Sequence, residues 1–366
     1  MSFESGSISC RISTFPHPIP DDAVEKFAGH AAPPLNTLGS GEIHGWVTGR
    51  HLLDRDLRED TASYAGYLRL TLMQAERKIP EPLLRAECKM EEIAELEASG
   101  RERLSAKIRS EIRKRVTERL LPDMPPNLKG IHFVYHKDTR FLYTSGMSDK
   151  QVDALSHSFQ QSLGMMPILV TPDSAAILRN AGNPRDWSAS SFSPEVDDDE
   201  ATVTPGEDFL TWLWFVSEAR GGTMVLDQLG TVAIMIDGPL TFFNEAGGAQ
   251  EAVVRKGEPR LSAEAKTALM SGKKLRRAKL TLALDEERTW STTIDSTFAF
   301  RGLKLPEGEK LDAVSKFQER QIYLDQFCGA FLDLYEIFCR ERNNPTAWSA
   351  TVQDLREWVR SRKTRN

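Results

Sequence analysis

Alternating apolar and polar residues predict strands in two parts of the N-terminal region. Residues 7–15 alternate weakly, and Leu68, Leu70 and Leu72 occupy every second position after Tyr67. Because successive side chains of a strand point to opposite faces of a sheet, these leucines share one face. We therefore expect one strand at residues 7–15 and a second that starts at residue 67.

A long segment that follows is rich in helix-forming residues and predicts a charged helical pair at about residues 81–121. Gly100 is expected to divide it into an acidic first helix and a second helix with a net charge of about +5 over residues 101–119. An apolar stripe along the second part comprises residues that recur at every fourth position: Leu104, Ile108, Ile112, Val116 and Leu120.

Residues 130–170 give the clearest local pattern, a β-β-α-β module. Two apolar runs flank a polar turn, and a helix then begins with Ser148 and Gln151 in the spacing of a capping box. Gly164 has the position of a residue that ends a helix, and "MMPILV" follows as a returning strand.

The second half of the chain predicts another set of strands and helices. "TVAIMIDGPLTFF" and "KLRRAKLTLAL" are typical of strands, and "SAEAKTALMSG" between them is typical of a helix. An aromatic helix begins near Leu311. Its residues at i, i+4, i+7 and i+11 share one face, which we expect to form core or a subunit interface, and which we assign as the candidate dimer interface: Phe327, Phe331, Leu334 and Phe338.

Together these patterns predict an α+β protein with two mixed β-sheet modules. Residues 1–170 are expected to form an N-terminal α+β module that contains the helical pair at about 81–121, followed by an acidic linker or loop at 171–208. We expect a second α+β module with a basic strand at 209–306, and C-terminal helices with a basic tail at 307–366.

Composition places the chain among soluble globular proteins. The 366 residues are 40% hydrophobic and 27% charged, with a formal net charge of −6. No apolar run is long enough for a membrane span, and the N-terminus has no signal-peptide pattern. The cysteines are scattered, as in a reduced cytosolic protein. No motif for a cofactor or a metal is present, so we expect neither.

Charge is distributed unevenly along this acidic chain. Residues 253–279 carry a net charge of about +7, whereas residues 171–208 carry about −7. Four of the nine cations in this segment belong to the start of the predicted strand "KLRRAKLTLAL", and Lys273 directly precedes them. In a strand, Lys273, Arg277 and Lys279 would point away from the leucines, with same-face neighbours about 7 Å apart, which suits successive phosphate contacts. A solvated basic face without a ligand explains the same pattern.

Other candidate sites have more ordinary explanations. Trp212 and Trp214 could stack on bases, but two tryptophans in an apolar segment are more often core. The acidic residues 197–200 could bind a divalent cation, but they are more typical of a linker.

Several segments, in order, resemble the RdgC family of bacterial recombination-associated proteins. They are "HGWV" at 44–47, "ERKIPEPLLRAECKMEEIAELEA", "IRSEIRKRVTERLLP", "SFQQSLGMMPI", "FLTWLWF", "VRKGEPRLSAEAKTALMSGKKLRRAKLTL" and "TFAFRGLKLPE". The chain departs from the better-known members by an acidic insert near 190–208 and a C-terminal extension from about Asn343.

The resemblance implies a ring-shaped homodimer whose hole admits double-stranded DNA with little sequence preference. It also implies a cytoplasmic, nucleoid-associated protein that restrains the strand-exchange recombinase, assists replication-fork maintenance and is not an enzyme. The family's basic positions, together with their cationic neighbours, give the DNA-binding candidates: Arg255, Lys256, Lys273, Lys274, Arg276, Arg277 and Lys279. The alternatives are a metal-dependent DNA-processing enzyme and a protein–protein adaptor that does not bind DNA.

Overall fold

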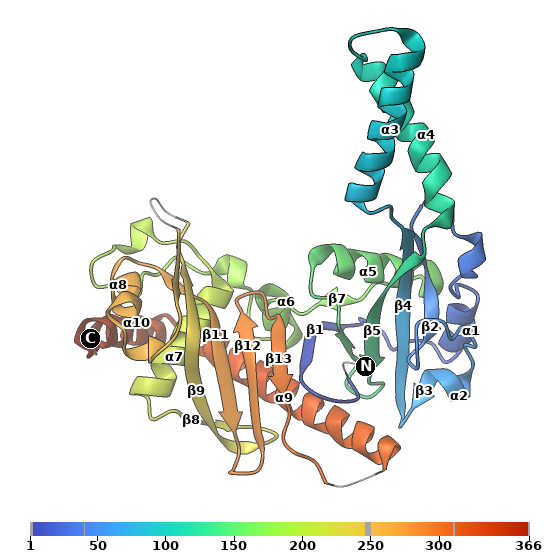
Figure 1. Cartoon of the computed structure of the whole chain (residues 1–366). Helices are drawn as coiled ribbons and strands as arrows, with labels where there is room; N and C mark the ends of the chain where they lie inside the picture. Colours follow the sequence, from blue (N-terminus) through green and yellow to red (C-terminus); the bar gives the residue numbers. More distant parts are fainter. Residues whose placement is uncertain (1–2, 40, 246–249, 310–311, 365–366) are drawn as a thin grey trace.

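One antiparallel β-sheet runs through the computed structural model, which describes residues 3–39, 41–245, 250–309 and 312–364 (Figure 1). Its main strands lie in this spatial order: β10 (Glu251–Val254), β9 (Gly230–Phe243), β11 (Lys274–Ala283), β12 (Thr289–Asp295), β13 (Phe300–Lys304), β1 (Ile8–Thr14), β6 (Phe141–Thr144), β5 (Pro126–Tyr135), β4 (Tyr67–Arg77) and β2 (Ile43–Thr48). Shorter strands pair with β4, β1 and β9 respectively: β3 (Ser63–Tyr64), β7 (Ile168–Leu169) and β8 (Thr223–Leu226).

Strand β1 joins the two halves of the chain. It pairs with β13 on one side, where Ile8 lies opposite Leu303, and with β6 on the other, where Arg11 lies opposite Thr144. The α+β class is thus confirmed, but the expectation of two mixed sheets is wrong, because the named strands form one sheet with antiparallel pairs. Alternation reveals which face a residue occupies, and it does not reveal which strand lies alongside. The division into four segments stays a prediction.

Helices of the N-terminal half pack on the sheet or project from it. The helices that come first are α1 (Ala23–Ala28), α2 (Glu59–Ala62), α3 (Glu81–Ser99), α4 (Ala106–Leu120) and α5 (Asp149–Leu163). Helices α1 and α5 share a hydrophobic core with the leucines of β4. Helices α3 and α4 project from the end of the sheet as an arm (Figure 1). Gly100 ends α3 in the left-handed conformation, as the sequence predicts.

The β-β-α-β prediction for residues 130–170 is confirmed by β5, β6, α5 and β7. Ser148 and Gln151 form the predicted capping box. The hydroxyl of Ser148 accepts a hydrogen bond from the backbone N–H of Gln151, and the side-chain oxygen of Gln151 accepts one from the backbone N–H of Ser148. Gly164 ends α5 with φ of 71°, which a residue without a side chain adopts most easily.

The remaining helices pack around the C-terminal half of the sheet. They are α6 (Pro172–Leu178), α7 (Pro205–Ala219), α8 (Ala263–Met270), α9 (Ala313–Asn343) and α10 (Pro345–Ser361). Trp212 and Trp214 of α7 are fully buried, which confirms that they belong to the core. Within the described parts of the chain, none of the helices combines the length and the apolar character that a membrane crossing requires.

The aromatic face of α9 lies inside the chain. Each of the four residues assigned as a dimer interface has 0% exposure and packs in the largest core cluster: Phe327, Phe331, Leu334 and Phe338. That assignment is therefore wrong, because side chains without exposed surface cannot contact a second copy. A helical stripe indicates that a face is buried, and it does not distinguish burial within a chain from burial between chains.

Candidate nucleic-acid interface

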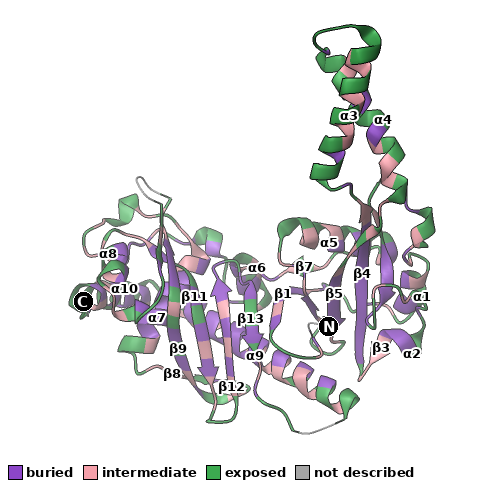
Figure 2. Cartoon of the chain, in the orientation of Figure 1, coloured by how far each residue is buried: buried purple, intermediate pink, exposed green. Residues whose placement is uncertain are grey.

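One face of the sheet in the C-terminal half is open to solvent. Helix α7 packs against β9 and β11 on the other, covered face. Leu280 and Leu282 of β11 point toward this covered face. The alternate residues Arg277 and Lys279 are exposed. Figure 2 shows the same alternation of buried and exposed residues along β9 and β11. The predicted two-faced basic strand is therefore present.

Cations on three neighbouring strands share this open face. Lys279 on β11 lies opposite Thr293 on β12, and Thr293 lies opposite Arg301 on β13. Because adjacent strands are about 4.8 Å apart, Lys279 and Arg301 lie in one row about 10 Å apart. Lys304 lies in the next row, opposite Ser291. We call Arg277, Lys279, Arg301 and Lys304 the basic face.

Sequence reasoning missed Arg301 and Lys304. Their spacing of three residues would place them on opposite faces of a regular strand. However, the register between β12 and β13 shifts at this point, and Gly302 between them has φ of 62°. An extra residue of this kind is a β-bulge, and it returns Lys304 to the face of Arg301. The signal in the sequence is only a glycine between an arginine and a leucine.

Two carboxylates lie among these cations. Asp295 Oδ2 is 3.6 Å from Arg301 Nη2 and 4.0 Å from Arg277 Nη2, so it lies between the two guanidinium groups. Asp237 lies opposite Lys279 in the register, and its Oδ1 is 3.8 Å from Nε of Arg260. Both carboxylates orient cations while leaving the face with a net positive charge. Among described residues, no carboxylate lies within 4.0 Å of the Lys279 or Lys304 ammonium group.

Arg276 is held at the side of the basic face by its own contacts. Its guanidinium group lies 4.1 Å from the ring centroid of Phe243 and 3.9 Å from the carboxylate of Glu207. Burial raises the pKa of Glu207, while a hydrogen bond from Ser296 and the charge of Arg276 oppose this effect. A register shift between Leu275 and Arg277 turns Arg276 outward, although alternation alone would point it into the core.

Lys274 does not belong to the open surface. It is the first residue of β11, and its ammonium group lies 2.6 Å from the carboxylate of Asp208. The side chain is 8% exposed and that of Asp208 is 0% exposed. This corrects its assignment as a DNA-binding residue, because its charge is neutralised inside the protein.

The other predicted cations lie near the edge of the sheet. Arg255 and Lys256 are exposed in the loop that follows β10, and Lys273 is partly exposed beside Ser271. These three residues lie outside the strand segments that carry the basic face. Their role in binding stays a prediction.

Residues 21–177 match the model of a protein family described as "Putative exonuclease, RdgC". This segment is thus similar to the RdgC family. The resemblance inferred from the sequence is thus confirmed over this range, which covers less than half of the chain and includes the arm. The match indicates a recombination-associated protein connected with nucleic acid. A search among curated proteins finds no match.

The basic face lies outside the matched RdgC domain, on strands β11 to β13. Across the described residues, no group of three or more His, Cys, Asp or Glu side chains is arranged to hold a metal ion. The described geometry of the basic face therefore offers positive charge and hydrogen-bond donors, which are the features that phosphate groups bind.

Proposed function

We propose that this protein binds double-stranded DNA without sequence preference and modulates homologous recombination. The observation that carries the proposal is the open basic face, with Arg277, Lys279, Arg301 and Lys304 on adjacent strands. The RdgC domain supports the connection with recombination. In this proposal the protein acts by occupying DNA in the cytoplasm, at the nucleoid, and so limits the access of the strand-exchange recombinase.

The spacing of the cations suits contacts to a nucleic-acid backbone. Same-face neighbours along a strand lie about 7 Å apart, and neighbours across strands about 5 Å apart, so several cations can meet phosphates of one duplex. Such contacts carry no information about base sequence. The flanking Ser291, Thr293 and Thr281 add hydroxyl groups to the same rows.

A homodimeric ring is the second part of the proposal. Helix α3 of the arm carries apolar residues on its outer surface that remain exposed in one chain: Leu83 is 37% exposed, Met90 64% and Ile93 45%. Their spacing of seven and three residues is that of a helix-packing seam. We propose that this seam packs against a second copy, which would close one side of a ring around DNA and support a role in replication-fork maintenance.

We further propose that the protein binds DNA without cleaving it. The supporting observation is that the basic face brings together cations and hydroxyl groups, with its carboxylates engaged by arginines. The description of the matched family names an exonuclease, so this part needs its own experiment. Incubation of end-labelled duplex with Mg²⁺ or Mn²⁺ is expected to leave the DNA intact, and time-dependent release of nucleotides would establish the alternative, a DNA-processing enzyme.

Fluorescence anisotropy with unrelated duplexes tests the binding proposal. Affinity should be similar for all sequences, and log K should fall with log salt by about 0.9 per phosphate neutralised. The double variant Lys279→Glu/Arg301→Glu should weaken binding to every duplex and lower the salt slope by about 2. Lys316→Glu is the matched control, since Lys316 is exposed on α9 away from the basic face.

Two results would contradict the binding proposal. Unchanged affinity of the double variant would show that the basic face does not contact DNA, and a strong preference for one duplex would show that bases are recognised. Sedimentation of the chain with and without Met90→Glu tests the dimer separately. A monomeric mass for the unsubstituted protein would exclude the ring while leaving DNA binding open.

A further inference from the structure

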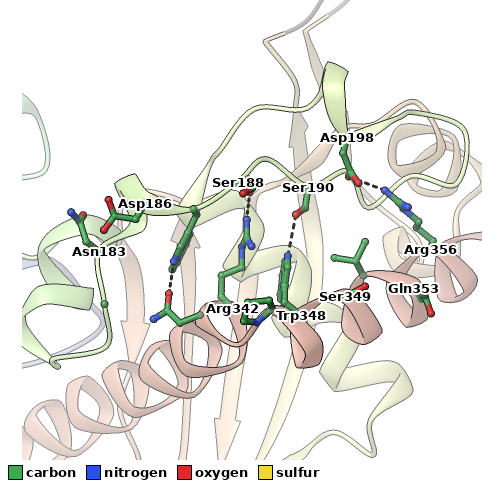
Figure 3. A pocket seen from close by; sticks show the side chains of 15 residues that line it. Asn183, Asp186, Ser188, Ser190, Asp198, Arg342, Trp348, Ser349, Gln353 and Arg356 are labelled. Carbon is green, nitrogen blue, oxygen red and sulfur yellow. Dashed lines mark hydrogen bonds and ion pairs between the residues drawn. The ribbon is translucent and has the colours of Figure 1, made fainter.

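A pocket of about 590 Å³ lies between residues 182–198 and the helices α9 and α10 (Figure 3). Both sides of it belong to segments that lie outside the matched RdgC domain. Residues 182–198 belong to the segment 171–208 that the sequence predicts as an acidic linker or loop, but Trp187 and Phe192 pack in the core and the segment lies along α10. The volume is within the range of small-molecule sites.

Arg342 is the charged group at the centre of this pocket. The residue is 7% exposed, and its guanidinium group lies between two indole rings, 5.2 Å from the centroid of Trp187 and 4.5 Å from that of Trp348. Figure 3 shows its side chain beside Trp348 and directed toward Ser188. Because the two indole rings lie against the faces of the guanidinium group, its N–H groups can find hydrogen-bond acceptors only around its edge.

The edge of this guanidinium group is only partly used. Nη2 donates to the carbonyl oxygen of Ser188, whereas Nε is buried and has no hydrogen-bond partner among described atoms. In the described ranges no carboxylate lies within 4.0 Å of Arg342, unlike Arg356, which pairs with Asp198 at 2.8 Å. Burial lowers the pKa of Arg342, and the charges of Asp208 and Asp198 only partly oppose this effect. A buried cation of this kind favours an anionic ligand.

The first turns of α10 favour an anion at the same place. The helix begins at Pro345, and Pro345, Trp348 and Ser349 line the pocket. The N-terminus of a helix carries partial positive charge and attracts phosphate groups. The hydroxyl of Ser190 is held by Trp348 Nε1 at 3.0 Å, and Ser349 and Gln353 offer further polar groups along the same helix face.

Two carboxylates also line the pocket and restrict the ligand. Asp198 is neutralised by Arg356 at one end, and Asp186 is exposed at the other. A carboxylate at the mouth would repel a polyanion but accept hydrogen bonds from hydroxyl groups. We propose that the pocket binds a phosphate monoester whose uncharged part carries hydroxyl groups, with the phosphate between Arg342 and the start of α10.

Isothermal titration of the full chain with AMP, adenosine and inorganic phosphate tests this site. AMP should bind, inorganic phosphate should compete with it, and adenosine should not bind. Ser349→Glu places a carboxylate beside Arg342 and should weaken AMP binding by at least about tenfold, while its position near the helix start preserves folding. Ala350→Glu is the matched control, since Ala350 is exposed on the same turn but does not line the pocket.

The outcomes distinguish this site from the basic face. AMP affinity that is unchanged in Ala350→Glu and in Lys279→Glu/Arg301→Glu, but reduced in Ser349→Glu, supports the proposal. Equal binding of adenosine and AMP, equal binding by Ser349→Glu, or no binding of AMP to the unsubstituted chain overturns it. Loss of AMP binding in the Lys279→Glu/Arg301→Glu variant would also overturn it, because AMP would then occupy the DNA surface.

Discussion

Lys274 and Lys279 lie on the same strand but differ in burial, and replacing each with methionine separates stability from binding. Lys274 Nζ lies 2.6 Å from Asp208 Oδ1, 3.2 Å from the carbonyl oxygen of Thr202 and 3.4 Å from the hydroxyl of Thr204. Lys279 is exposed on the basic face. Methionine removes the charge in each case and keeps a side chain of similar length.

The expected loss of stability follows from what Lys274→Met leaves behind. Asp208 has 0% exposure, and its Oδ2 has no hydrogen-bond partner among the described residues, so the carboxylate would keep only weak neutral donors. Removing one partner of a buried ion pair costs about 3–5 kcal/mol. This is a large part of the roughly 5–15 kcal/mol that stabilises a typical folded protein. Lys279→Met, at an exposed position, should change stability by less than about 0.5 kcal/mol.

Denaturant unfolding and DNA anisotropy of the two variants form the assay. Lys274→Met should lower the free energy of unfolding and leave DNA affinity unchanged under conditions where it is folded. Lys279→Met should do the opposite. The double variant Lys274→Met/Asp208→Leu should regain most of the lost stability, because a buried ion pair and an apolar pair of similar size are often equivalent. A Lys274→Met protein of normal stability and weakened DNA binding would refute the assignment of Lys274 to a buried ion pair and not to the DNA surface.

Two further predictions concern packing and pH. Gly206→Ala should destabilise the protein by about 1–3 kcal/mol relative to the control Gly39→Ala. A Cβ at Gly206 would lie 1.9 Å from the carbonyl oxygen of Ser296, whereas a Cβ at Gly39 would have no atom within 4 Å. Equal melting temperatures of the two variants would contradict this prediction. Burial raises the pKa of Asp325, so its protonated form is favoured in the folded state. The stability from this group is present below the unfolded pKa of about 3.9 and is lost as pH rises through the folded value. The free energy of unfolding of the unsubstituted protein, minus that of the Asp325→Asn variant, should therefore fall as pH rises from about 4. A difference that increases with pH would exclude the raised pKa of Asp325.

The sequence predicts the β-β-α-β module of residues 130–170 well because its signals are local. A capping box, a glycine at a helix end and an apolar run each act within a few residues, so the helix from Asp149 to Leu163 and its flanking strands follow from the chain order. The helical arm follows in the same way from Gly100 and its periodic stripe. No such signal shows that β1 pairs with strands from both halves, because its partners are about 130 and 290 residues away.

The candidate site shows where local reasoning fails on the sheet. Counting in twos from Leu280 correctly places Lys279 outward, but it would also place Leu275 outward, although Leu275 has 0% exposure and packs in the core. The same counting fails for Arg276 and Lys304, and in both cases a register shift lies beside the residue. A bulge adds one residue and inverts the face of every residue after it. Which cations share a surface is therefore decided by the positions of the bulges, and a charge count along the sequence can identify the basic segment but not the residues that bind.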